Sequence, residues 1–160
     1  CMMCAMPLSK IHRTFPAAAA DYFFSSLPRS AVSAVLINAL PFDRKLKGVE
    51  SLAVCAELLK NEGNVLIIFP EGTRTTTGEM GRFRSGIGHL VAGTNLPVLP
   101  CHLEGGLKAW PKGKAIPRPS PLHLKIGAPR LYGHLEKSAA TVKHICRDLE
   151  KGVAELGKAE

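Results

Sequence analysis

The feature that most constrains the fold is a short apolar run, Val65–Phe69, which meets a proline and is followed by polar and charged residues. Four aliphatic residues and a phenylalanine in succession are typical of a strand that is buried on both faces. Pro70 has no amide hydrogen for a sheet ladder, so we expect the strand to end there. Open α/β sheets usually bind ligands at the carboxyl ends of their strands. The residues after Phe69 are therefore the first candidates for a functional site.

The segment that follows this proline, Glu71–Arg74, combines a carboxylate, a glycine, a hydroxyl and a guanidinium. Gly72 permits a positive φ or a close approach of the backbone to a ligand. The planar fork of Arg74 suits a phosphate or a carboxylate. Alternatively, Glu71 and Arg74 simply pair with each other in a turn, because ion pairs at strand ends are common and weak. Taken alone, these residues leave both interpretations open.

Apolar segments with helical and strand spacing alternate along the chain. A helical pattern from Gly48 to Leu59 precedes the Val65–Phe69 strand, and a second buried strand is expected within Leu96–Leu103. Leu122–Ile126 alternates like a half-exposed strand, and an amphipathic stripe begins at about Ser138. This order predicts one α/β domain over residues 1–160, with a mixed, largely parallel central sheet flanked by helices.

The net charge of the chain indicates an anionic partner. A formal charge of +8 over 160 residues suits nucleic acid, an anionic membrane or phosphorylated metabolites. The basic residues are scattered over loops without interleaved aromatic residues, which argues against nucleic acid. The longest apolar run, within Ala31–Leu40, is about half the length of a membrane-spanning helix. Peripheral attachment to a membrane is therefore the most that this sequence predicts.

The cysteines give no sign of a metal site. Their number is odd, and the Cys1-x-x-Cys4 pair has neither a second pair nor a histidine at metal-binding spacing. We expect free cysteines in a reducing compartment, which favours the cytoplasm.

The Phe69–Arg74 segment, Phe-Pro-Glu-Gly-Thr-Arg, resembles the FPEGTR block of the glycerolipid acyltransferase superfamily, which includes the 1-acylglycerol-3-phosphate acyltransferases. Leu96–Cys101 is similar to the proline-containing strand of this family, with Pro100 at the usual proline. Asn38–Arg44 loosely matches the family's G-x-x-F-I-x-R block: the arginine is present and the glycine is replaced. The order and spacing of these blocks agree with the family.

The first block of the family, a His-x4-Asp pair, is absent from the 160-residue sequence. The residues five positions after the six histidines are Ala17, Thr94, Leu107, Ala128, Ala139 and Leu149. In relatives the pair comes before the region that matches Ala17–Phe24, and the chain starts with Cys1 instead of Met. We therefore expect a chain truncated at its amino terminus, with the catalytic pair upstream of Cys1 and no catalytic residue within the sequence itself.

The chemistry that the resemblance implies is acyl transfer in phospholipid synthesis. The acyl group would move from a thioester, on CoA or acyl carrier protein, to a hydroxyl of glycerol phosphate or a lysophospholipid. A histidine would act as the general base, and an aspartate would hold its tautomer. The thioester is a co-substrate, and no cofactor or metal is implied. The resemblance further implies a cytoplasmic protein that attaches peripherally to the membrane.

The resemblance also implies a set of substrate-binding residues. These are Arg44, Phe69, Pro70, Glu71, Gly72, Thr73, Arg74 and Pro100. Arg44 and Arg74 are the candidates for binding the acceptor's phosphate, and Glu71 would shape the loop with the backbone of its neighbours. The alternative is a catalytically inactive relative of the same fold that binds phosphate or lipid. Because both would share this pocket, only the residues upstream of Cys1 distinguish them.

Overall fold

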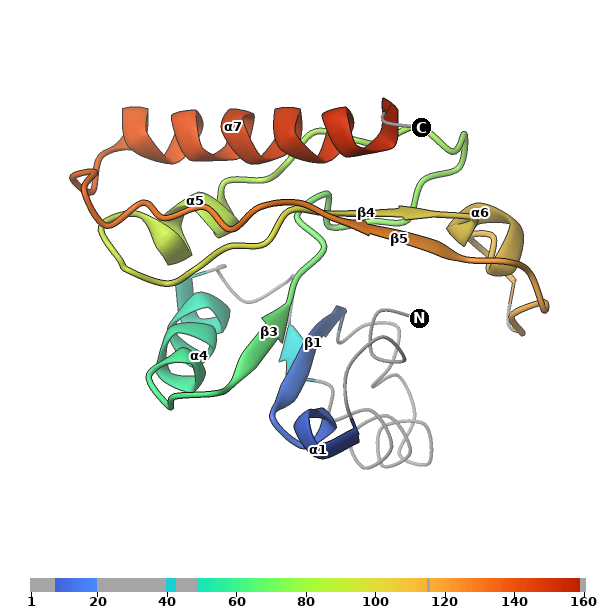
Figure 1. Cartoon of the computed structure of the whole chain (residues 1–160), viewed down its shortest axis with the longest axis horizontal. Coiled ribbons are helices and arrows are strands. Elements are labelled where there is room, and N and C mark those ends of the chain that lie inside the picture. Colours follow the sequence, from blue (N-terminus) through green and yellow to red (C-terminus); the bar gives the residue numbers. More distant parts are fainter. Residues whose placement is uncertain (1–7, 20–39, 43–48, 115, 159–160) are drawn as a thin grey trace. The chain divides into compact units, whose positions relative to one another are not determined.

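The computed structural model describes residues 8–19, 40–42, 49–114 and 116–158 (Figure 1). The chain divides into two compact units, residues 1–69 and 70–160, which we call the N-terminal and the C-terminal unit. The prediction of one domain over the whole chain stays a prediction.

The N-terminal unit contains a parallel sheet of three strands in the order β2-β1-β3. The helix α1 (Leu8–Ile11) leads into the central strand β1 (Thr14–Ala19), which lies between β2 (Leu40–Phe42) and β3 (Val65–Ile67). The first half of β1 pairs with β3 and the second half pairs with β2. Pro16 is the last residue paired with β3, so its missing amide hydrogen falls where β1 changes partners.

The helix α4 (Val49–Leu59) precedes β3 and confirms the predicted helix. Its Cys55 is buried, and its last turn is capped by Asn64, whose side-chain amide donates to the Leu58 carbonyl at 2.9 Å. Gly63 follows with a φ of +83°, a conformation that favours glycine. The chain can therefore turn from α4 into β3 within a few residues.

The strand β3 is shorter and more exposed than predicted. It ends at Ile67, before Pro70, and only Ile67 among its three residues is buried. Val65 is 37% exposed, and Phe69, beyond the strand, is 52% exposed. The physical reason is position, since β3 is an outer strand of the three described and pairs on one side with β1. The expectation of burial on both faces was wrong here.

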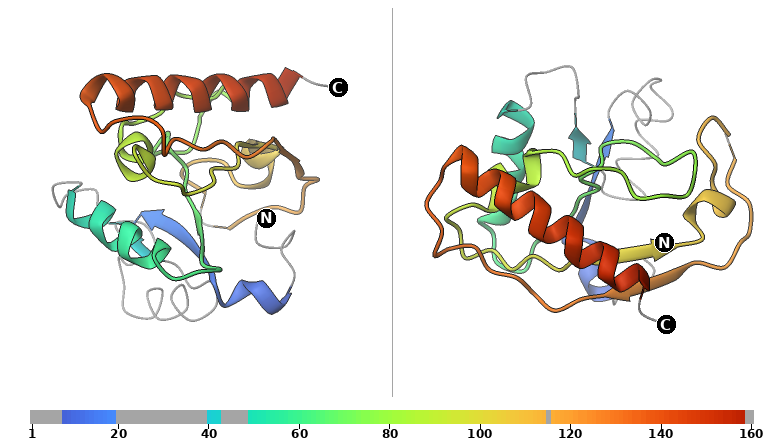
Figure 2. Two further views of the ribbon diagram at one scale, coloured as in Figure 1. Left: turned by 60° about the vertical axis from the view of Figure 1, so that its left-hand side comes forward. Right: turned by 90° about the horizontal axis from the view of Figure 1, so that it is seen from above.

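The C-terminal unit packs one long helix over a short helix and an antiparallel pair of strands. The elements are α5 (Gly86–Val91), β4 (Cys101–Glu104), α6 (Gly106–Ala109), β5 (His123–Ile126) and α7 (Ala139–Lys158). Figures 1 and 2 show α7 running along α5 and the β4–β5 pair. β4 and β5 pair from Cys101 opposite Ile126 to Glu104 opposite His123.

The core of this unit lies between α7 and α5. Ile145, Leu149 and Val142 of α7 are nearly or fully buried, which confirms the amphipathic stripe. The two helices approach closely at Gly88, where a Cβ would lie 2.7 Å from the carbonyl oxygen of Val142. Ser138 caps the start of α7, because its hydroxyl accepts the amide hydrogen of Thr141 at 3.1 Å.

The second predicted strand, Leu96–Leu103, starts later than expected. Its regular pairing begins at Cys101, and the preceding residues form only one isolated bridge, in which Val98 exchanges two hydrogen bonds of 2.9 Å with Arg130. Pro97 and Pro100 interrupt the ladder because they have no amide hydrogen to donate. The α/β class itself is confirmed, with parallel strands linked by a helix in one unit and helices packed on a strand pair in the other.

Candidate substrate-binding site

The loop that follows β3 in the chain is closed at its base by backbone and side-chain hydrogen bonds. We call Pro70–Arg84 the site loop. The carbonyl of Pro70 accepts the amide hydrogen of Arg84 at 2.9 Å, which brings the two ends together. The amide of Phe83 donates to the carboxylate of Glu150 on α7 at 2.9 Å. The site loop is thus tied to itself and to the long helix of the C-terminal unit.

Glu71 accepts two hydrogen bonds from other residues of the site loop. Its Oε2 accepts the amide hydrogen of Gly81 at 2.6 Å, a charge-assisted bond, and its carbonyl accepts from Nε of Arg84 at 3.2 Å. A Cβ at Gly81 would lie 3.1 Å from that Oε2, so a small residue favours the close approach. The carboxylate therefore acts on the shape of the loop.

Gly72 is required by the backbone at this point. Its φ is +70°, in the left-handed region, and a Cβ there would lie 2.7 Å from Nε of Arg84. Any other residue would be strained and would displace the Arg84 side chain. The sequence predicted either a positive φ or a close approach, and the structure shows both, with a side chain of the same loop as the close neighbour.

Arg74 lies over the ring of Trp110. Its guanidinium carbon is 5.2 Å from the ring centroid, within the range of a cation–π contact. Nη1 of Arg74 also lies 3.4 Å and 3.5 Å from the carbonyl oxygens of Trp110 and Pro111. Glu71 and Arg74 thus contact different parts of the unit, Gly81 and the Trp110 segment respectively.

Trp110 is a site residue that sequence reasoning missed. It was assigned only to an irregular loop rich in proline, lysine and glycine. Arg74 and Trp110 are 36 positions apart, and no periodic pattern links them. The one available signal was composition, since Trp110 is the only tryptophan of the chain.

The middle of the site loop is organised by threonine side chains. The hydroxyl of Thr75 accepts the amide hydrogens of Thr77 and Gly78 at 3.2 Å and 3.0 Å. The hydroxyl of Thr77 accepts the amide hydrogen of Glu79 at 3.2 Å. Such bonds offer the backbone a local alternative to helix or sheet. Thr73, by contrast, is exposed.

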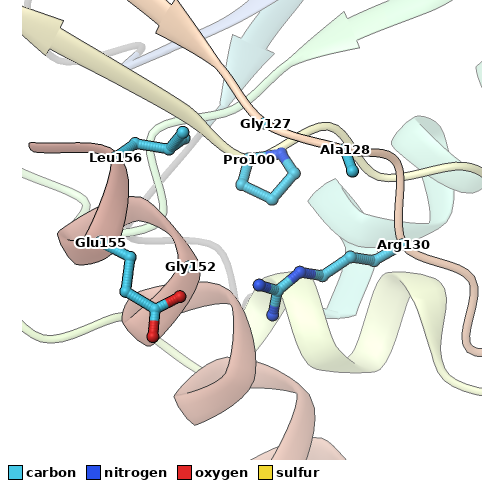
Figure 3. Close-up of a pocket in the computed structure, with 7 residues that line it drawn as sticks. All are labelled: Pro100, Gly127, Ala128, Arg130, Gly152, Glu155 and Leu156. Carbon is cyan, nitrogen blue, oxygen red and sulfur yellow. The ribbon is translucent and has the colours of Figure 1, made fainter. Parts of the chain in front are cut away.

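Pro100 is buried in a pocket against α7. A cavity of about 350 Å³ is lined by Pro100, Gly127, Ala128, Arg130, Gly152, Glu155 and Leu156 (Figure 3). The carbonyl of Pro100 accepts the amide hydrogen of Gly127 at 2.8 Å. The structure thus places this predicted site residue between the end of β5 and α7.

A cluster of three polar side chains borders this pocket. Nη1 of Arg130 lies 2.5 Å from Oδ1 of Asp148, and the hydroxyl of Tyr132 donates to Oδ2 of the same carboxylate at 2.7 Å. A Cβ on Gly152 would collide with the Arg130 guanidinium, so glycine makes room for it. This cluster fastens the segment after β5 to α7.

The same cluster shifts the pKa values of its members. Burial, together with the hydrogen bond to Asp148, raises the pKa of Tyr132 well above its ordinary value of 10.0. Burial on its own would raise the pKa of Asp148, but the bonds from Tyr132 and Arg130 outweigh it and hold that pKa below its usual range. The carboxylate is therefore kept charged and the phenol neutral near pH 7.

Other predictions meet the structure only in part. Arg44 lies outside the described residues, so its pairing with Arg74 at one phosphate stays a prediction.

Cys55, Cys101 and Cys146 are free, as expected, and burial raises the pKa of each thiol. None of the described helices has both the length and the apolar character to cross a bilayer. Within the described residues, no group of histidine, cysteine, aspartate and glutamate side chains is suited to a metal ion.

The chain belongs to the acyltransferase family: a family model described as Acyltransferase matches residues 1–104. This confirms the resemblance carried by the Phe69–Arg74 segment, which lies inside the matched range. Trp110, Arg130 and α7 lie beyond it.

Named relatives agree with this assignment. The chain is 37% identical over 97 residues to the 1-acyl-sn-glycerol-3-phosphate acyltransferase of Cocos nucifera, covering 59% of this chain and 32% of that protein. It is 33% identical over 94 residues to the protein of the same name from Pseudomonas aeruginosa, covering 58% of this chain and 36% of that one.

A solved structure shares the fold. The crystal structure of the 1-acyl-sn-glycerophosphate (LPA) acyltransferase PlsC from Thermotoga maritima matches with a TM-score of 0.61 and 27% identity, over 89% of this chain and 56% of that chain. The chain thus spans about a third of the length of the curated relatives and about half of the solved structure.

Proposed function

We propose that the chain is part of an enzyme that transfers a fatty acyl group from a thioester to a hydroxyl of 1-acylglycerol 3-phosphate or a related glycerol phosphate, in phospholipid synthesis. The observation that carries the proposal is the Phe69–Arg74 segment, in which Glu71 and Gly72 shape the loop and Arg74 is oriented on Trp110. The relatives from Cocos nucifera and Pseudomonas aeruginosa, both named 1-acyl-sn-glycerol-3-phosphate acyltransferase, support the choice of acceptor.

Arg74 is the proposed anchor for the phosphate of the acceptor. A guanidinium matches phosphate geometry, and a hydrogen bond to a charged group contributes about 1.5–3 kcal/mol. Arg44 is proposed as a second anchor on the evidence of its motif alone. With the phosphate held, the free hydroxyl of the acceptor would be presented to the thioester in a fixed geometry.

The chemical step needs a base that removes the hydroxyl proton. The alkoxide oxygen attacks the thioester carbonyl, an ester bond forms, the carbon–sulfur bond breaks, and the thiolate leaves and takes up a proton. Since none of the six histidines is followed by aspartate at the fifth position, the proposal places the His–Asp pair outside these 160 residues. The donor is proposed to be acyl-CoA or acyl carrier protein, and neither cofactor nor metal is invoked.

Attachment to an anionic membrane surface is part of the proposal. The chain carries a formal charge of +8, and the segment after α6 presents the exposed residues Lys112 and Arg118 beside Ile116, which is 78% exposed. Each basic residue near an anionic membrane contributes about 1 kcal/mol, and an exposed apolar side chain can enter the interface. A peripheral position on the cytoplasmic side would bring the lipid acceptor to the site.

The alternative is a relative that binds phosphate or lipid without catalysis. It is favoured by one observation, the absence of a His-x4-Asp pair from the sequence. Both hypotheses use the same site loop, so they differ only in whether that pair precedes Cys1 in the natural protein.

An acyl-transfer assay distinguishes these possibilities. The 160-residue chain and a version extended to its natural start are incubated with labelled oleoyl-CoA and 1-oleoylglycerol 3-phosphate in vesicles with or without anionic lipid. We expect turnover only for the extended protein, and faster turnover on anionic vesicles at low salt. An extended protein that carries the pair yet fails to acylate would overturn the proposed reaction. Equal rates on both vesicles would remove the membrane part.

A further inference from the structure

We propose that Trp110 is a positioning residue for the phosphate site: its indole face holds the guanidinium of Arg74 in the orientation that binds the acceptor's phosphate. The proposal rests on the proposed function and goes beyond the motif, because Trp110 lies outside residues 1–104, which the family model matches. It names a second wall of the site, contributed by the segment after α6.

Three contacts hold the guanidinium of Arg74, one with the indole ring and two with backbone carbonyl oxygens. The ring centroid lies 5.2 Å from the guanidinium carbon, and Nη1 lies 3.4 Å and 3.5 Å from two successive carbonyl oxygens, those of Trp110 and Pro111. An arginine side chain has several rotatable bonds, so ordering it before the ligand arrives lowers the entropic cost of binding. Ring and carbonyls orient the cation without changing its formal charge.

Trp110 is itself held at two points, which makes it a rigid platform. Its amide donates to the carbonyl of Gly106 at 2.9 Å at the end of α6, and its indole Nε1–H donates to the carbonyl of Lys114 at 2.8 Å. The loop is closed by a third bond, from the amide of Arg118 to the carbonyl of Ala109 at 2.7 Å. A ring fixed at both its backbone and its indole nitrogen can transmit its position to Arg74.

A purely structural role makes different predictions. If the contact only braced the site loop against the Trp110 segment, loss of the ring would lower the stability of the unit and leave phosphate affinity unchanged once the protein is folded. A positioning role instead predicts that loss of the ring weakens phosphate binding even in the protein that remains folded. It also predicts that phosphate binding is sensed at the indole, whose emission responds to charge near its ring.

The test uses calorimetry with 1-hexanoylglycerol 3-phosphate as the probe and 1-hexanoylglycerol as the control without phosphate. We expect Trp110→Leu to weaken binding of the phosphate probe about three- to tenfold. Trp110→Phe keeps a ring face but loses the indole hydrogen bond to Lys114, so we expect its affinity to lie between those of Trp110→Leu and the wild type. Leu131→Ala, which truncates a 55% exposed side chain elsewhere in the unit, is the matched control and should bind like the wild type.

Fluorescence gives a second readout that does not depend on a Trp110 variant folding. Because Trp110 is the only tryptophan of these 160 residues, the emission reports on the surroundings of this one ring. We expect the emission to change on saturation with the phosphate probe, and to change without ligand in Arg74→Ala. An emission that is the same with and without saturating probe would overturn the inference.

The outcomes separate this inference from the proposed function. If Arg74→Ala abolishes binding while Trp110→Leu binds like the wild type, the positioning role is overturned and the phosphate role of Arg74 stands. If the wild type binds the phosphate probe no better than the control, both the site assignment and the inference fail. Weakening by Trp110→Leu with partial recovery in Trp110→Phe supports the positioning role.

Discussion

At the scale of single residues, the site loop depends on backbone conformations and contacts that few side chains would permit. Gly72 has a φ of +70° and stands against Nε of Arg84, while Glu71 reaches across to the amide of Gly81. These two residues fold the loop so that Arg74 faces the Trp110 segment. The role of the Phe-Pro-Glu-Gly-Thr-Arg motif is therefore partly architectural.

Substitution of Gly72 tests this architecture against a matched glycine. We expect Gly72→Ala to lower the free energy of unfolding by about 2–3 kcal/mol, because a left-handed conformation is unfavourable for alanine and the Arg84 side chain must also move. Gly113 has a φ of +87° and nothing within 4 Å of a built Cβ, so Gly113→Ala should cost only about 1 kcal/mol. Urea unfolding of both variants measures the difference, and equal losses would show that the contact with Arg84 carries no cost.

At the scale of elements, α7 is the part of the structure that the sequence predicts best. Val142, Ile145 and Leu149 recur at helical spacing, and all three are buried against the rest of the C-terminal unit. The strands were predicted less well because Pro97 and Pro100 delay the start of β4, and because an outer strand such as β3 is exposed on a side that its composition does not reveal.

The attachment of α7 through Tyr132 gives this element a dependence on pH. The raised pKa of Tyr132 means that its contribution to stability is complete below the ordinary value of 10.0 and is lost as pH rises from there towards the raised value. We expect Tyr132→Phe to lower the free energy of unfolding at pH 7 by about 1–2 kcal/mol, since a hydrogen bond to a carboxylate is lost.

Unfolding measured from about pH 8 to 11.5 should show this titration. Above about pH 10 the stability of the wild type should fall more steeply than that of Tyr132→Phe, so that the two curves converge. Curves that stay parallel over the whole range would contradict a neutral, hydrogen-bonded phenol in the folded state.

At the scale of the whole molecule, the family assignment came from contiguous residues, whereas the site needs residues that are far apart in sequence. The Phe69–Arg74 segment, taken with the Leu96–Cys101 and Asn38–Arg44 blocks, indicated the family, and the family model that matches residues 1–104 confirms it. The Arg74–Trp110 contact joins positions 36 apart through a loop with no periodic pattern, so the sequence pattern did not predict it. The role of Arg44 in the same site remains a prediction from its motif.

The measurement that tests the central claim most directly is the Michaelis constant for the phosphorylated acceptor, measured in the version of the protein that is active in the acyl-transfer assay. Arg74→Ala is compared with Arg147→Ala, which removes an exposed guanidinium from α7. We predict that Arg74→Ala raises this constant about ten- to a hundredfold with a much smaller change in kcat, because a charge-assisted phosphate contact is lost from ground and transition states alike. Arg147→Ala should leave both constants unchanged. An acceptor Michaelis constant unaffected by Arg74→Ala would contradict the assignment of this loop as the phosphate site.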